Sequence, residues 1–219
     1  MKNSFETGEN MAIVSEIREI KGIIEVSLDG VRWLKLRKKH FALHPLELDE
    51  AVDPEEYIDS IAAAQAADCY EAALTMLDQA AQTRNDLAKK LMRKGYVAPA
   101  AEAAAARLCE IGLIDDRRFA ERIAQGQLKK PVGAYAVRRK LMARQLSEED
   151  VEAAMEGFDD AQQAGACKAA AEKLWRKYSA LPSREGRAKL SQALARRGFS
   201  WDAIRSAVDA LASDEDFFE

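Results

Sequence analysis

Residues 112–120 read Gly-Leu-Ile-Asp-Asp-Arg-Arg-Phe-Ala, and this stretch predicts a joint between two helices. Gly112 tolerates a positive φ, the conformation that commonly ends a helix. Asp115 or Asp116 offers a carboxylate to the free backbone N–H groups at the start of the next helix. The joint marks a boundary in the chain, and the sequence on its two sides indicates that the joined units are alike.

Three segments share an apolar residue, basic residues and a helix stop, and they begin 50 and 53 residues apart. Each is preceded by one amphipathic segment and followed by another, so each unit is expected to hold three helices. Helical units with a period of about 50 residues indicate a stacked array that buries apolar faces between neighbours. The segments are residues 91–96 (Leu-Met-Arg-Lys-Gly-Tyr), 141–146 (Leu-Met-Ala-Arg-Gln-Leu) and 194–199 (Leu-Ala-Arg-Arg-Gly-Phe).

The sequence ahead of these units predicts a β-hairpin. β-Branched and aromatic residues run up to the Asp-Gly dipeptide at 29–30 and away from it, and this dipeptide favours a two-residue turn. Because an isolated hairpin is marginal in water, residues 13–20 are expected to add a third strand, or the hairpin to lie against a helix. Pro54 suits the first position of a helix, and residues 55–81 predict one long helix or two with a break near Asp68.

We predict a mainly α fold of three tandem three-helix repeats in an elongated curved array, with a small N-terminal β-hairpin extension. The expected domains are a flexible leader (1–12), the hairpin extension (13–53), a linker helix (54–68), three repeats (69–115, 116–161 and 162–211) and an acidic tail (212–219). The expected helices of the repeats span 70–81, 87–94 and 99–111, then 119–128, 135–144 and a segment after Ser147, then 163–178, 187–197 and a segment after Ser200.

Charge is distributed unevenly along a chain whose net charge is only −4. Residues 84–144 carry 15 Lys and Arg against 6 Asp and Glu, residues 168–205 carry 10 against 3, and acids prevail elsewhere. One basic residue at a helix C-terminus is explained by the helix dipole and needs no partner. The remaining basic charge indicates a face for an anionic partner such as DNA, unless it is solvated on every side of the helices.

Composition and spacing argue against an enzyme, a metalloprotein and a membrane protein. The sequence has no glycine-rich phosphate loop and no nucleophile spaced with a base. His40 and His44, the only histidines, lack a convincing third metal ligand. Cys69, Cys109 and Cys167 lie in Ala-rich segments and are expected to be buried thiols. No apolar run approaches the roughly 20 residues that cross a bilayer, so we expect a cytoplasmic protein without a cofactor.

The motifs resemble those of the RecX family of regulatory proteins. The resemblance rests on Gly-Leu-Ile-Asp-Asp-x-x-Phe-Ala at 112–120 joined to Arg-Arg-Gly-Phe-Ser at 196–200, with Leu91 and Lys-Gly-Tyr at 94–96 ahead of them, and it covers roughly residues 70–211. It implies tandem three-helix repeats that bind the recombinase RecA and modulate, usually restrain, its filament on single-stranded DNA. It also implies action by occupancy of the filament groove, without chemistry.

The chain departs from the family pattern in three respects. Family members often carry arginines where this chain has Ala80 and Gln82, and only Arg84 remains there. The middle repeat has Gln145 where glycine is usual, so the helix before it is expected to end in another way. The hairpin is outside the common core of the family, although some members have such an extension.

Basic residues in and near the second helix of each repeat are the candidates for contacts with the recombinase or, weakly, with single- or double-stranded DNA. These residues are Lys90, Arg93, Lys94, Arg138, Arg139, Lys140, Arg144, Lys189, Arg196 and Arg197. A second set is expected to fix the angle between repeats, with an apolar pair able to clamp the helix start that the first aspartate caps. These residues are Gly112, Ile114, Asp115, Asp116, Phe119, Gly198 and Phe199.

The repeats and the resemblance together predict a non-enzymatic regulator of RecA, most often an inhibitor, in DNA repair, recombination and the SOS response. The alternative is a DNA-binding regulatory protein of the helix-turn-helix type, which the short helices, glycine turns and basic blocks would also fit. Tight, sequence-selective binding of duplex DNA without recombinase would favour the alternative.

Overall fold

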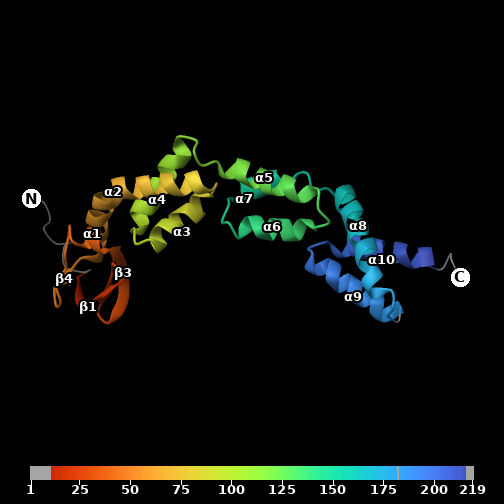
Figure 1. The fold of residues 1–219 in the computed structure, drawn as a ribbon, viewed down its shortest axis with the longest axis horizontal. Coiled ribbons are helices and arrows are strands. Elements are labelled where there is room, and N and C mark those ends of the chain that lie inside the picture. Colours follow the sequence, from red (N-terminus) through yellow and green to blue (C-terminus); the bar gives the residue numbers. More distant parts are fainter. Residues whose placement is uncertain (1–10, 182, 216–219) are drawn as a thin grey trace, which may run out of the picture. The chain divides into compact units, whose positions relative to one another are not determined.

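The computed structural model describes residues 11–181 and 183–215, and Figure 1 labels its elements. The chain divides into two compact units, Met1–Ile114 and Asp115–Glu219. Each unit has its own hydrophobic interior and is described by itself.

Two expected segments fall largely outside the described residues. The leader expected over residues 1–12 is described only at its last two positions, and Ala12 begins the first strand. Of the acidic tail expected over residues 212–219, only the backbone of residues 212–215 is described, and it continues the last helix. None of the helices within the described ranges combines the length and apolarity needed to cross a membrane.

The N-terminal unit opens with a four-stranded antiparallel sheet in the order β3-β2-β1-β4. The predicted hairpin is confirmed, with Asp29 and Gly30 at φ 49° and 80°, and the predicted third strand pairs with it. Both turn residues have positive φ, as a type I′ turn requires. The short strand β4, which the sequence did not suggest, pairs with the start of β1. The strands are β1 (Ala12–Ile20), β2 (Ile23–Leu28), β3 (Val31–Arg37) and β4 (Ala51–Val52).

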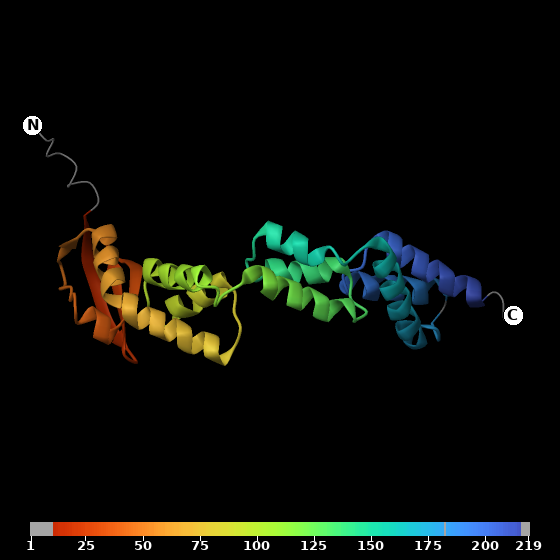
Figure 2. The ribbon, with the colours of Figure 1, turned by 90° about the horizontal axis from the view of Figure 1, so that it is seen from above.

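One long helix, α2 (Pro54–Gln79), runs from the sheet along the first repeat (Figure 2). It starts where the Asp53 carboxylate accepts two backbone N–H groups, and it continues through Asp68 without a break. A single apolar core joins Val14 of the sheet to Leu91 of the repeat. The extension is therefore packed as an integral part of the N-terminal unit.

The predicted three-helix repeats are confirmed. Several helices begin three or four residues earlier than the apolar pattern suggested, because capping side chains such as Thr83 and Asp159 lie upstream of the first apolar residue. A helical turn, α1 (Lys38–Phe41), follows the sheet. The remaining helices are α3 (Arg84–Arg93), α4 (Ala98–Glu110), α5 (Asp116–Leu128), α6 (Ala134–Met142), α7 (Glu148–Met155), α8 (Asp160–Tyr178), α9 (Ser183–Arg196) and α10 (Trp201–Glu215).

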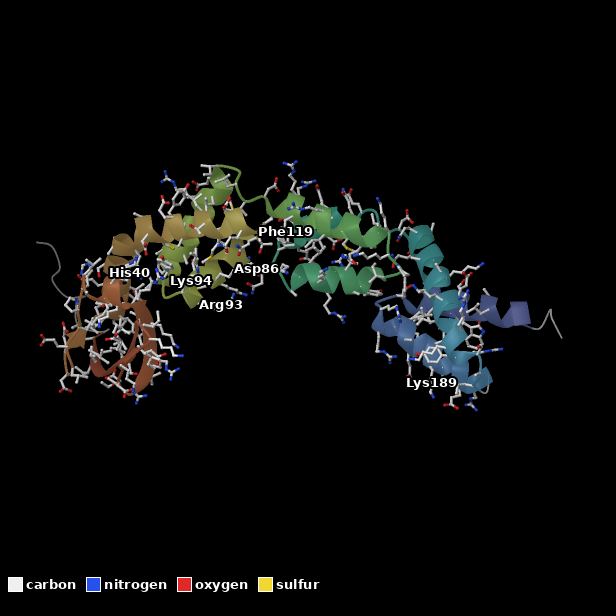
Figure 3. The ribbon with its side chains drawn as sticks, viewed as in Figure 1. His40, Asp86, Arg93, Lys94, Phe119 and Lys189 are labelled. Carbon is white, nitrogen blue, oxygen red and sulfur yellow. The ribbon has the colours of Figure 1, made fainter. Side chains whose placement is uncertain are left out.

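Gly112 and Asp115 have the local geometry that the sequence predicts. Gly112 has φ 74°, and the Asp115 carboxylate accepts the N–H of Arg118 at 2.8 Å, so Asp115 is the cap of α5. Ile114 is buried in the core of the N-terminal unit, whereas Phe119 is half-buried beside the Arg122 guanidinium (Figure 3).

In every repeat, a residue with positive φ lies two or three residues after the end of the second helix. Gly95 and Gly198 have φ 87° and 83°, as their sequence positions predict. The expectation for the middle repeat is wrong, because Gln145 takes the same left-handed conformation, with φ 53°, in place of a glycine. A non-glycine residue there costs about 1 kcal/mol of backbone strain.

The C-terminal unit contains two apolar cores, one for each of its repeats. Val151 and Leu141 lie at the centre of the core formed by α5, α6 and α7. Leu190 and Ile204 lie at the centre of the core formed by α8, α9 and α10, where Phe199 is also buried. Because the two cores are separate, the repeats meet through the hydrogen bonds and close backbone contacts described below.

Candidate partner-binding site

In the first repeat, the candidate cations surround a hollow beside the end of α3. Arg93 and Lys94 are exposed there (Figure 3). Lys90 is half-buried. The three side chains line a hollow of about 370 Å³ together with Gln82. Within the described ranges, no carboxylate lies within ion-pair distance of these three cations, so their charge is available to an anionic group.

In the second repeat, one candidate is already neutralised. The Arg138 guanidinium lies 2.6 Å from the Glu152 carboxylate of α7 and makes an ion pair within the repeat. Arg139 and Lys140 are exposed on α6, as is Arg144 beyond its end. In this helix, Arg139 and Lys140 are therefore better placed than Arg138 to contact an anionic partner.

In the third repeat, two of three candidates make local contacts. Lys189 projects from α9 (Figure 3) and pairs with Glu185 one turn earlier, at 2.7 Å. The Arg197 guanidinium donates to the carbonyl of Ala193 at 3.2 Å, a usual contact for a cation at a helix C-terminus. Arg196 is exposed and pairs with no carboxylate in the described part of the chain.

The third helix of each repeat is poorly suited to reading DNA. In a helix-turn-helix protein, the first residues of the second helix of the motif contact base edges, and Arg, Lys, Asn and Gln make these contacts. None of these residue types occurs in the first four positions of α4, α7 or α10. The first turn of α7 instead carries Glu148, Glu149 and Asp150, which would repel phosphate.

A contact that the sequence did not reveal joins the two repeats of the C-terminal unit. The cap residue of α6, Gly133, has no side chain to offer the free N–H groups of that helix. The third repeat supplies the acceptors instead. The N–H groups of Gly133 and Tyr135 donate to the carbonyls of Arg197 and Gly198, at 2.9 and 3.1 Å. The N–H between them, on Ala134, donates to the side-chain oxygen of a buried glutamine of α8 at 2.7 Å.

Two glycines make this contact possible. A Cβ on Gly133 would lie 2.0 Å from the carbonyl carbon of Gly198, and a Cβ on Gly198 would lie 2.3 Å from the amide nitrogen of Ala136. Such approaches are far shorter than van der Waals contact. Gly198 is thus required twice, once for its positive φ and once for the approach of α6.

A comparable polar network holds the turn between α3 and α4 in the N-terminal unit. Gln65 of α2 is fully buried, accepts the N–H of Val97 at 2.8 Å and donates to the carbonyl of Gly95 at 3.1 Å. Its amide nitrogen also lies 3.2 Å from Nδ1 of His40. Because that nitrogen can only donate, Nδ1 must carry a lone pair, and the imidazole is neutral with its proton on Nε2.

The other side of this network is centred on Asp68. Its carboxylate accepts from His40 Nε2 at 3.1 Å, from the Tyr96 hydroxyl at 2.7 Å and from Lys39 Nζ at 2.6 Å. Burial alone would raise the pKa of Asp68, but the hydrogen bonds from Lys39 and Tyr96 outweigh it and hold the pKa below its usual value. Burial lowers the pKa of His40 despite the neighbouring carboxylate. The network fixes the end of α3, where the cations of the first repeat lie.

The cysteines and histidines make no metal site among residues 11–181 and 183–215, where no group of three or more potential ligands converges. Cys69 and Cys167 are buried, and burial raises their pKa values to about 12 and about 11. Cys109 is half-buried. The first two thiols are therefore poor nucleophiles at neutral pH.

Three family models match the chain in succession: the first, second and third three-helix domains of RecX, at residues 69–108, 115–155 and 161–208. The chain belongs to the RecX family. Among family members, the regulatory protein RecX of Chlorobaculum tepidum is 35% identical over 144 residues, which cover 65% of this chain and 88% of the relative. A crystal structure of regulatory protein RecX superposes with a TM-score of 0.62 and 27% identity over 90% of this chain and 99% of that one.

Some family members also match across the N-terminal extension. The regulatory protein RecX of Limosilactobacillus reuteri (strain DSM 20016) is 26% identical over 209 residues, covering 94% of this chain and 79% of the relative. RecX from Lactobacillus salivarius gives a TM-score of 0.61 at 25% identity, covering 68% of this chain and 98% of that chain. Because this match covers 94% of the chain, it must include most of the sheet and of α2. Most of these elements lie ahead of residue 69, where the first matching family model begins.

Proposed function

We propose that this protein binds the RecA recombinase and its filament on single-stranded DNA, and that it restrains recombinase activity by occupying the filament. The family to which the chain belongs is one of regulatory proteins. The choice of RecA as the partner rests on the resemblance of the sequence motifs to those of the family. Regulation by binding is consistent with the exposed cations at the ends of the second helices.

The observation that carries the proposal is the recurrence of exposed cations at or near the C-terminal end of the second helix of each repeat. Arg93 and Lys94 lie at the end of α3, Arg139 and Lys140 near the end of α6, and Arg196 at the end of α9. Exposed positive charge that recurs in every repeat suits a partner that is itself repetitive, such as a protein filament or a polyanion.

The helices that would enter a DNA groove disfavour the alternative. A helix-turn-helix reader needs hydrogen-bonding side chains at the start of its recognition helix. Here those positions are filled by alanine and proline in α4 and by three acids in α7. Sequence-selective duplex binding is therefore the weaker of the two candidate functions.

The test is a titration of the full chain into RecA on single-stranded DNA, with ATP hydrolysis and strand exchange as readouts. We expect progressive inhibition that weakens as salt is raised, because exposed charges are screened. No change in either readout at a saturating amount of the protein would refute the proposed function.

Charge-reversal variants of the exposed cations test which of them contact the partner. The variants Arg93→Glu with Lys94→Glu, and Arg139→Glu with Lys140→Glu, should each weaken inhibition while leaving the melting temperature nearly unchanged, because these side chains are exposed. Lys173→Glu with Arg176→Glu is the matched control, since both side chains are exposed on α8, the first helix of its repeat, and the pair changes the net charge by the same amount. Equal loss of inhibition in the control would mean that net charge alone is responsible.

A further inference from the structure

The side-chain amide of Gln65 is held in one orientation by two backbone groups of the turn between α3 and α4. Its oxygen accepts the N–H of Val97 at 2.8 Å, and its nitrogen donates to the carbonyl of Gly95 at 3.1 Å. A backbone N–H can only donate and a carbonyl can only accept, so reversing the amide would break both bonds. Because Gln65 is fully buried, bulk water does not replace either partner.

The third contact of this amide is with a titratable group. The amide nitrogen lies 3.2 Å from Nδ1 of His40, which can accept only while the imidazole is neutral. A proton on Nδ1 would place two donors face to face at a site where both side chains are buried. Reversing the amide would satisfy that proton but would lose Gly95 and Val97. No orientation of Gln65 therefore satisfies both a protonated His40 and the turn.

The surroundings of the imidazole favour its neutral form. The charged and titratable groups that face it are Asp68 on α2, Lys39 on α1, Arg37 at the end of β3 and Tyr96 in the turn. Burial outweighs the attraction of Asp68, and the two cations add repulsion, so the pKa of His40 lies below its ordinary value. The Asp68 carboxylate accepts from Nε2 and from the Tyr96 hydroxyl, and neither bond changes when Nδ1 gains a proton. Because the closed arrangement binds the proton less readily than an exposed imidazole does, a fall in pH favours release of the turn.

The turn lies directly against the N-terminal extension and leads out of α3. Gly95 has φ 87°, and a Cβ on it would lie 3.1 Å from the backbone nitrogen of Arg37. Arg93 is the last residue of α3, and Lys94, its C-cap, is exposed in the turn. Leu91 is fully buried one turn earlier. Release of the turn would therefore alter the end of α3, with its two cations, and leave the body of the helix packed.

We propose that His40 and Gln65 form a proton-sensitive latch, which holds the turn between α3 and α4 against the N-terminal extension and opens when Nδ1 is protonated. Both residues precede residue 69, where the first matching family model begins, so the latch is contributed by the sheet extension and the start of α2. The latch does not depend on the proposed function. Only its effect on partner binding does.

The experiment is an NMR titration of the full chain from about pH 7.5 to about pH 5, a range that spans the ordinary histidine pKa. It records the protonation of His40 and the exchange protection of the Val97 amide, corrected for the intrinsic effect of pH on exchange. Protection should fall as His40 is protonated, by up to about tenfold for each pH unit, while the Leu91 amide stays protected. A Val97 amide that stays protected after His40 is protonated would overturn the proposal, as would a His40 that stays neutral at the acid end.

Two variants of the latch and one control test these contacts. His40→Asn places an amide oxygen near the position of Nδ1, where it can accept from Gln65 but cannot be protonated, so protection at Val97 should not vary with pH. Gln65→Glu offers a carboxylate oxygen to a protonated Nδ1, so it should raise the pH at which His40 is protonated. His44→Asn, at an exposed histidine, should behave as the wild type does. An unchanged pH dependence in His40→Asn would overturn the proposal, and the wild-type titration decides it even if a variant fails to fold.

The effect on the partner is tested by comparing inhibition of RecA by the wild type and by His40→Asn at about pH 7.5 and about pH 6. Both proteins meet the same recombinase at each pH, so the ratio of their inhibitory concentrations is independent of how pH affects RecA itself. The wild type should weaken severalfold relative to the variant at the lower pH, because a released turn no longer positions Arg93 and Lys94. A constant ratio would overturn the effect on the partner. No inhibition by either protein at any pH would refute the proposed function and leave the latch intact.

Discussion

Gly133→Ala tests the backbone contact that joins the second and third repeats. Gly133 has φ −81° and ψ 152°, a conformation that alanine adopts without strain. If the site were open, the substitution would stabilise the protein by about 0.4–1 kcal/mol, because alanine restricts the unfolded chain. The added Cβ would instead lie 2.0 Å from the backbone of Gly198, which cannot rotate away as a side chain can.

The expected cost follows from the hydrogen bonds that must break. Moving the Cβ beyond the shortest tolerable contact requires a backbone separation of about 1 Å, starting from the 2.0 Å approach. That shift removes the bonds from the N–H groups of Gly133 and Tyr135 to the third repeat. At about 1 kcal/mol for each bond, with a further penalty for a buried N–H left without a partner, the net loss is about 2–3 kcal/mol.

The assay is thermal unfolding combined with hydrogen exchange of the full chain. A loss of this size lowers the melting temperature of the C-terminal unit by on the order of 10 °C. Exchange should accelerate at the amides of residues 133 and 135. A variant that melts at the wild-type temperature, with both amides still protected, would refute the reasoning.

Two other glycines provide matched controls. Gly126 is exposed within α5 and has no atom within 4 Å of an added Cβ, so Gly126→Ala should stabilise the protein by about 0.5–1 kcal/mol. Gly112 also has open space but has φ 74°, so Gly112→Ala should cost about 1 kcal/mol through backbone strain alone. Together they separate steric exclusion from conformational strain.

Two further predictions concern the cap of α5 and the buried histidine. Asp115→Ala should destabilise the C-terminal unit by about 1 kcal/mol in urea unfolding, because the N–H of Arg118 loses its acceptor, and an unchanged midpoint would contradict the capping role. Folding lowers the pKa of His40, so stability of the N-terminal unit should be complete above about pH 6.5 and fall by up to about 1.4 kcal/mol per pH unit below it. Urea unfolding at several pH values should show this slope in the wild type and in His44→Gln but not in His40→Gln. A slope retained by His40→Gln would assign it to another group.

Features decided within one or two helical turns could be predicted from the sequence. Asp115 and Ser147 were readable as caps because a cap depends on a short polar side chain next to its own helix. Gly95 and Gly198 were readable as helix ends because positive φ favours glycine. Gln145 shows the limit of that rule, since a non-glycine residue occupies the same conformation when the surrounding structure holds it there.

The sequence predicts which helices carry the candidate cations, but it does not predict which of these cations are already paired with a carboxylate. The pair of Lys189 with Glu185 was detectable in the sequence from its spacing of four residues on one helix. The pair of Arg138 with Glu152 was not, because it joins two helices whose mutual orientation the sequence does not specify. Which basic side chains remain available to a partner is therefore a property of the packed repeat.

The sequence by itself determined the repeat, its helices, several of their caps and the family, because periodicity and capping depend on neighbouring residues. Only the tertiary structure decided that Gly133 approaches Gly198, and that Gln65 links α2 to the turn after α3. It also placed Gln82 beside the cations of α3. These contacts depend on how closely two backbones approach and on which buried polar atoms find partners, and neither quantity is written in the local pattern of residues.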